Sequence, residues 1–257
     1  MLQIATELET TKKLTKKERR LLRKAGNPVE SGLKLRPLVP LTMNQRKTFE
    51  QYYRGQNLIL HGVPGTGKTF LALGLALDEV LNSSSVFKKV IIYRSLVETR
   101  KQGFQPGDAK KKASPYEPPY KGICSELYGR ADAYDVLKNK GLVEFESTSF
   151  LRGITLRNTI VIVDEVQNLT SHELHSIITR VGKDSKILFC GDYRQIDLDK
   201  RHERSGILDF IKILKAMSGF SFVEFGAKDI VRSDLVKQYI ITRLDLEDKG
   251  EIEPLGT

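Results

Sequence analysis

The sequence has little that would direct it to a membrane or to an oxidising compartment. It contains two cysteines, Cys124 and Cys190, and no tryptophan. Because the cysteines lack C-x-x-C spacing, neither a disulfide framework nor a zinc site is predicted, and we interpret both residues as structural. No stretch of about eighteen apolar residues is present, and no apolar core follows the N-terminal charges. We therefore expect a cytoplasmic protein that does not interact with membranes.

Acidic residues are also few relative to basic ones. Forty-two Lys and Arg residues stand against thirty-two Asp and Glu residues, which gives a net charge of +10 and a pI near 9.5. This balance favours a polyanionic partner beyond any small ligand, and we expect RNA or single-stranded DNA. A basic protein whose charge serves only solubility is the alternative.

The ends of the chain differ in charge from its centre. Residues 1–40 carry clusters of Lys and Arg followed by prolines, and we interpret them as a basic N-terminal tail and linker. The tail is either a cationic helix that binds nucleic acid or a mobile extension. We expect a single domain over residues 41–245 and a short acidic tail over residues 246–257.

Between the tails, apolar runs alternate with helical stretches, which predicts an α/β fold. The expected strands are Leu58–His61, Val90–Tyr93, Val143–Ser147, Thr159–Asp164, Ile187–Cys190 and Phe222–Phe225. Such alternation is typical of a three-layer sandwich, in which helices cover both faces of a mostly parallel sheet. Residues 101–121 interrupt the pattern as a long loop, which is either functional or disordered.

One segment fits the phosphate-loop pattern G-x-x-x-x-G-K-[ST]. It follows an apolar strand and precedes an apolar helix, and it consists of Gly62, Val63, Pro64, Gly65, Thr66, Gly67, Lys68 and Thr69. Glycines let backbone N–H groups converge on phosphate oxygens, and the helix that continues through Phe70 directs its positive end at the same anion. The pattern predicts binding of a nucleoside triphosphate, with Lys68 on the β- and γ-phosphates and Thr69 on Mg²⁺.

Two acids end the apolar strand Thr159–Asp164. We predict that Asp164 holds Mg²⁺ through water and that Glu165 orients or deprotonates the attacking water. This pair favours hydrolysis over phosphorylation of a small molecule. A small-molecule kinase would need a second substrate pocket, and no motif for one is recognisable in the sequence. Gln195 follows another strand end and is a candidate for sensing the γ-phosphate or aligning the water, although an ordinary loop residue would also fit there.

Taken together, these segments resemble the PhoH family of phosphate-starvation-type ATPases, which are related to the RecA-like core of superfamily 1 helicases. The resemblance covers about residues 42–241. It is carried by Asn44-Gln45, Gly62–Thr69, Gly103–Asp108 with Pro115-Tyr116, Phe150–Gly153, Val163–Asn168, Gly191–Gln195, Ser205-Gly206 and Asp229–Arg232. The sequence departs from the family where Arg94 is followed by Ser95, since the family usually has Arg-Pro there.

The resemblance implies roles for residues outside the phosphate loop. Gln45 would read the adenine edge, and Arg232 would act as an arginine finger from the same or a neighbouring subunit, although a surface salt bridge is the alternative for Arg232. Such helicases place nucleotide between two core domains, and this chain is long enough for one. The resemblance therefore implies a homo-oligomer, and it points to a hexamer.

Two functions from different classes follow. The first is an ATPase whose Mg²⁺-dependent hydrolysis is coupled to binding or remodelling RNA or single-stranded DNA. Lys110–Lys112, Arg94 and Arg100 would contact phosphates, while Phe104, Tyr116 and Tyr120 would either stack on bases or hold the loop in place. The second is a nucleotide-gated scaffold that assembles and recruits a partner with little hydrolysis.

Overall fold

The computed structural model describes residues 33–95, 114–148, 155–192 and 201–253, with side chains throughout except at 201–205. Six strands form one sheet in the order β3-β2-β4-β5-β1-β6. Their bounds are Asn57–Gly62 (β1), Lys89–Arg94 (β2), Val143–Ser147 (β3), Thr159–Asp164 (β4), Lys186–Gly191 (β5) and Phe220–Phe225 (β6). All six predicted strands are confirmed, and every neighbouring pair among them is parallel.

The sheet is buried on both faces. Every residue of β4 and of β5 is buried, and side chains alternate between two apolar clusters along β4. Ile160 and Ile162 join one cluster, while Val161 and Val163 join the other. A parallel strand covered on both faces needs apolar residues at successive positions, which is why these strands are continuous apolar runs in the sequence.

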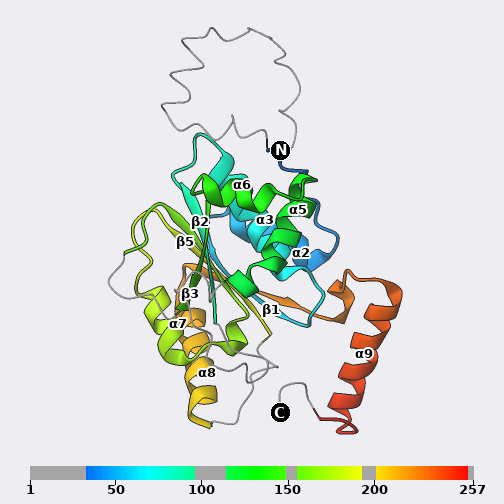
Figure 1. The fold of residues 1–257 in the computed structure, drawn as a ribbon. Helices are drawn as coiled ribbons and strands as arrows, with labels where there is room; N and C mark the ends of the chain where they lie inside the picture. The colour runs from blue at the N-terminus through cyan, green and yellow to red at the C-terminus, as the bar shows by residue number, and fades with distance from the viewer. Residues whose placement is uncertain (1–32, 96–113, 149–154, 193–200, 254–257) are drawn as a thin grey trace, which may run out of the picture.

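Helices cover each face of the sheet (Figure 1). One layer contains α2 (Met43–Tyr53), α3 (Lys68–Leu81), α5 (Pro118–Tyr128) and α6 (Ala133–Asn139), and the other contains α7 (Ser171–Ile178) and α8 (Arg201–Ala216). Three short 3₁₀ turns, η2 (Ser114–Tyr116), η4 (Val166–Asn168) and η6 (Ala227–Asp229), complete the layers. The predicted three-layer α/β sandwich is confirmed.

The expected loop over residues 101–121 is wrong at its C-terminal end. Residues 114–116 form η2, and α5 begins at Pro118. Pro118 and Pro119 occupy the first turn of this helix. Proline is tolerated there because a backbone N–H in the first turn has no partner within the helix, and because the fixed φ of proline suits a helix. The proline-rich stretch is therefore the start of a helix. Residues 101–113 of the expected loop lie outside the described residues.

At both ends, ordered structure extends beyond the single domain predicted over residues 41–245. Leu33, Leu35 and Leu38 of the expected linker pack against the core, and the N–H of Arg36 donates to the carbonyl of Leu127. The last helix, α9 (Asp234–Asp248), runs past residue 245 and has no buried residue. It stands at the edge of the molecule, beyond β6 (Figure 1). Within the described part of the chain, no helix has the length and apolarity needed to span a membrane.

Candidate nucleotide-binding site

The phosphate loop lies between the end of β1 and the start of α3. Gly62, Gly65 and Gly67 all have positive φ, and a Cβ at Gly62 would lie 2.0 Å from the carbonyl oxygen of Phe225 on β6. The N–H of Val63 donates to that same oxygen at 3.0 Å. Only glycine fits at position 62, because the backbone of β6 leaves no room for a Cβ and because the positive φ disfavours other residues. The contact with β6 therefore fixes the direction in which the loop leaves β1.

The amine of Lys68 is held across this loop. Its Nζ donates to the carbonyls of Gly62 and Val63, each at 2.8 Å, and lies 3.4 Å from Oγ1 of Thr66. Burial lowers the pKa of Lys68 below its ordinary value, and the charge of Asp192 opposes that shift. A bound phosphate would provide a stronger acceptor than these carbonyls, so the lysine is placed where the phosphate loop needs it.

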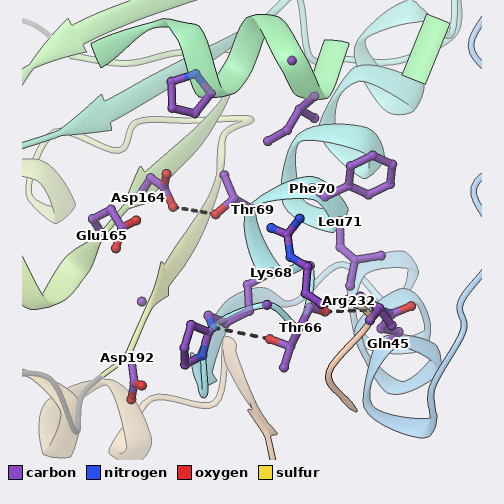
Figure 2. A pocket seen from close by; sticks show the side chains of 18 of the residues that line it. Gln45, Thr66, Lys68, Thr69, Phe70, Leu71, Asp164, Glu165, Asp192 and Arg232 are labelled. Atoms are coloured by element: carbon purple, nitrogen blue, oxygen red, sulfur yellow. Dashed lines mark hydrogen bonds between the residues drawn. The ribbon is translucent and has the colours of Figure 1, made fainter. Parts of the chain in front are cut away.

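Asp164 connects β4 to the phosphate loop. Oγ1 of Thr69 donates to Oδ1 of Asp164 at 2.8 Å, and the hydroxyl of Tyr120 donates to Oδ2 at 2.7 Å. Burial raises the pKa of the Asp164 carboxyl, and the neighbouring charge of Glu165 acts in the same direction, whereas the two hydrogen bonds oppose it. Figure 2 shows Asp164 and Thr69 joined beside Lys68.

This donor set fits Mg²⁺. The ion needs few protein oxygens when substrate phosphates and water complete its coordination, and a hydroxyl beside a buried carboxylate is such a pair. No cluster of three or more metal-ligating His, Cys, Asp or Glu side chains exists within the described ranges. Thr69 and Asp164 are the residues of this site that would hold the cation.

Glu165 is held in place by a residue that sequence reasoning missed. Nε2 of Gln167 donates to Oε2 of Glu165 at 2.5 Å, while Oε1 of Gln167 accepts from the N–H of Asp192 at 3.1 Å. Glu165 itself has a left-handed backbone, with φ of 52°. Gln167 thus connects the predicted catalytic acid, which directly follows β4, to the residue that directly follows β5. Its signal in the sequence was its position in the matched stretch Val163–Asn168.

Gln45 braces the phosphate loop from α2. Its Oε1 accepts from the N–H of Leu41 at 2.7 Å, and its Nε2 donates to the carbonyl of Thr66 at 3.1 Å. The side chain is buried. Each amide atom can take one more hydrogen bond, so these contacts leave capacity for a ligand while they connect Leu41 to the loop.

Two arginines, Arg94 and Arg232, line the same site. The N–H of Val231 donates to the carbonyl of Gly65 at 3.0 Å, which places the exposed Arg232 side chain across the mouth of the loop in the same chain (Figure 2). Arg94, at the end of β2, interacts electrostatically with Tyr120, Glu165 and Asp164. The structure places Arg94 in the wall of a cavity that the phosphate loop also lines, and its predicted contact with nucleic-acid phosphates stays a prediction.

These residues surround one cavity of about 790 Å³, large enough for a nucleotide. Its walls include the predicted residues Gln45, Pro64, Gly65, Thr66, Gly67, Lys68, Thr69, Phe70, Asp164, Glu165 and Arg232. Gly62 and Val63 shape the turn behind it. Gln195, Arg100, Phe104 and Lys110–Lys112 lie outside the described residues.

The sequence left two roles open for Tyr120, stacking on bases or holding the loop in place, and the first of these is wrong. Its ring has no exposed surface, and its hydroxyl is bonded to Asp164. Tyr116 is only partly buried and lies with its ring centroid 6.0 Å from the guanidinium carbon of Arg94. The sequence showed aromatic residues beside a basic segment, but it did not show that α5 turns Tyr120 into the core.

A phosphate loop between β1 and α3, with an acid pair at the end of β4 beside it, defines a P-loop NTPase of RecA-like fold. The family model described as PhoH-like protein matches residues 37–243. The chain belongs to this family, as the sequence predicted.

Two bacterial relatives agree with that assignment. The chain is 36% identical over 200 residues to a PhoH-like protein of Bacillus subtilis (strain 168), covering 77% of this chain and 61% of the relative. It is 34% identical over 200 residues to a PhoH-like protein of Synechocystis sp. (strain ATCC 27184 / PCC 6803 / Kazusa), covering 77% and 60%. The chain thus spans about three fifths of the length of these relatives.

Among solved structures, the large terminase of a thermophilic bacteriophage, solved in complex with ADP, matches with 14% identity and a TM-score of 0.43, over 78% of this chain and 49% of that one.

Proposed function

We propose that this protein binds ATP with Mg²⁺, hydrolyses the ATP, and couples hydrolysis to binding or remodelling RNA or single-stranded DNA. The observation that carries the proposal is the arrangement of two neighbouring acids. Asp164 is bonded to Thr69 of the phosphate loop, while Glu165 is held separately by Gln167. Nucleotide hydrolysis requires two roles, one group that holds the cation and one that orients or deprotonates the attacking water, and the two carboxylates would divide these roles.

The phosphate loop would bind the triphosphate. Its backbone N–H groups and the N-terminus of α3 stabilise the anion, and Lys68 would exchange its bonds to the Gly62 and Val63 carbonyls for phosphate oxygens. Thr69 would ligate Mg²⁺ directly and Asp164 through water. When bound, the cation would supply Lewis-acid neutralisation of the charge that develops on the phosphates.

Glu165 would orient or deprotonate the attacking water. Its carboxylate is anchored at Oε2 by Gln167, and its Oε1 would accept from the water. Arg232 would supply positive charge to the γ-phosphate, and its position over Gly65 supports a contribution from the same subunit. Gln195 follows β5, whose end is tied to Gln167, and we keep it as a candidate sensor of the γ-phosphate.

The base would lie at the apolar end of the cavity. The cavity wall includes the apolar residues Leu38, Val39, Phe70 and Ile123 as well as the amide of Gln45, and apolar walls with a few placed polar groups are typical of small-molecule sites. Gln45 would use its remaining hydrogen-bond capacity to read adenine. A competition assay with ATP and GTP tests this, because Gln45→Ala should reduce the preference for ATP.

The net charge of +10 supports a nucleic-acid partner. Contacts to phosphates release counterions, so affinity for single-stranded RNA or DNA should fall steeply as salt rises. Fluorescence anisotropy with labelled single strands between about 50 and 200 mM salt measures this. Affinity that stays constant over the series would contradict a phosphate-directed interaction. Phosphate release with and without each strand then shows which nucleic acid stimulates hydrolysis.

A second function, a nucleotide-gated scaffold, is favoured by α9. This helix exposes Leu235 at 77% and Tyr239 at 61%, next to the arginine at the mouth of the cavity. Apolar side chains exposed beside a nucleotide site suit assembly into a homo-oligomer, for which we propose a hexamer. Sedimentation with ATP and with a non-hydrolysable analogue separates the alternatives. Equal assembly with both nucleotides, without stimulation of hydrolysis by nucleic acid, would favour the scaffold.

A further inference from the structure

Tyr120 is a buried tyrosine whose hydroxyl reaches the metal-site carboxylate. Tyr120 belongs to α5 and lies 44 residues before Asp164 in the sequence, and its hydroxyl donates to Oδ2 at 2.7 Å. Thr69 donates to the other oxygen at 2.8 Å. Both oxygens of Asp164 therefore accept a hydrogen bond, which defines the plane of the carboxylate.

The surroundings of Tyr120 hold it in this orientation. Its ring lies 5.5 Å from the ring of Phe145 on β3, measured between centroids, and has no exposed surface. Pro118 and Pro119 restrict the backbone of the turn that carries it. The phenol hydroxyl is a hydrogen-bond donor at neutral pH, and the packing of the ring directs it at Asp164.

A carboxylate in this position has two requirements that Tyr120 meets. Buried ionised groups need hydrogen bonds, because the interior does not replace the water they lose. The carboxylate must also keep Oδ1 on the hydroxyl of Thr69, so that a lone pair of that hydroxyl remains directed at the cation. Without a donor on Oδ2, the carboxylate is free to rotate away from this alignment.

We propose that Tyr120 is a positioning residue for the divalent cation, acting through Asp164 on the Thr69–Asp164 pair. This role rests on the proposed Mg²⁺-dependent nucleotide site. Tyr120 does not contact the nucleotide. Outer partners of metal ligands commonly change metal affinity by about 10- to 100-fold when they are removed, while the ligands themselves remain.

The test compares Tyr120→Phe with Tyr128→Phe. Tyr128 is buried two turns later on the same helix, and its hydroxyl has no hydrogen-bond partner among the described residues. Each substitution removes one buried hydroxyl, but only the first removes a bond to Asp164. Binding of a fluorescent ADP analogue is measured over a Mg²⁺ titration and again in EDTA, and the spectrum of bound Mn²⁺ is recorded by electron paramagnetic resonance.

We expect Tyr120→Phe to raise the Mg²⁺ concentration for half-maximal binding about tenfold or more. It should change the Mn²⁺ spectrum and leave binding in EDTA as in wild type, while Tyr128→Phe matches wild type throughout. The proposal is overturned if the two variants behave alike, or if Tyr120→Phe loses binding in EDTA, since the effect would then not run through the cation. A wild-type protein whose binding ignores Mg²⁺ would refute the proposed function instead.

Discussion

His61, the half-buried histidine near the end of β1, makes stability depend on pH. Burial lowers the pKa of its imidazole below the ordinary value of 6.5. The unfolded chain therefore takes up this proton first as the pH falls, and the unfolding free energy contributed by His61 is present above about pH 6.5 and is lost through the folded-state pKa. Urea unfolding between about pH 5 and 8 should show stability decreasing toward acid.

Replacement of the histidine tests this assignment. His61→Gln should reduce the decrease in stability below about pH 6.5, whereas His172→Gln, at an exposed histidine on α7, should leave the profile unchanged. Identical profiles for wild type and His61→Gln would show that another group causes the pH dependence.

Gly191 makes room for the side chain that holds Glu165. A Cβ at this position would lie 2.7 Å from Oε1 of Gln167 and 2.9 Å from the backbone N of Val166. Gly191→Ala should therefore displace Gln167, lower phosphate release, and destabilise the fold by about 1–3 kcal/mol. At Gly219 a Cβ would meet nothing closer than 3.8 Å, so Gly219→Ala is the control. Unchanged turnover in Gly191→Ala would argue against a role for the Gln167 bridge.

At single residues, local patterns predicted the site and tertiary contacts completed it. Lys68, Thr69 and Asp164 followed from short motifs whose spacing is set within one strand, loop or helix. Tyr120 and Gln45 act through contacts between segments distant in the sequence, 44 residues apart for Tyr120 and Asp164 and 21 apart for Gln45 and Thr66. Spacing along one sequence contains no information about such neighbours.

Among the secondary-structure elements, strands were predictable because a parallel sheet buried on both faces leaves continuous apolar runs. The run Thr159–Asp164 matches β4 at both ends, while β6 begins at Phe220, two residues before the expected strand. Helix α5 was missed because its first turn is rich in proline, which resembles a loop. Proline is compatible with a helix only in the first turn, and the composition of the segment does not show that Pro118 and Pro119 occupy that turn.

Helix α7 begins with a capping box that contributes to stability. Oγ1 of Thr170 accepts from the N–H of Glu173, and the carboxylate of Glu173 accepts from the N–H of Thr170. Thr170→Ala should lower the free energy of unfolding by about 1 kcal/mol. Thr179→Ala, at the C-terminal end of the same helix, lacks this effect on the N-terminal cap. Equal losses in denaturant unfolding would contradict the capping contribution.

For the molecule as a whole, the charge and the cavity point to different ligands. The cavity lies at the carboxyl ends of β1, β4 and β5, whereas the count of 42 basic and 32 acidic residues is a property of the whole chain and assigns the charge to no particular surface. Composition predicted a polyanionic partner but not the surface that contacts it. Much of what was assigned to that contact, residues 1–32 of the tail together with Arg100 and Lys110–Lys112, lies outside the described ranges.

Phosphate release from ATP with Mg²⁺, measured together with ATP binding, tests hydrolysis at this site most directly. The comparison uses wild type, Glu165→Gln and Glu224→Gln, in which the last changes an exposed acid of β6 outside the cavity. We expect Glu165→Gln to bind ATP like wild type but release phosphate at least about 100-fold more slowly, while Glu224→Gln retains turnover. Phosphate release by wild type that is no faster than by Glu165→Gln would contradict the assignment of this site to ATP hydrolysis.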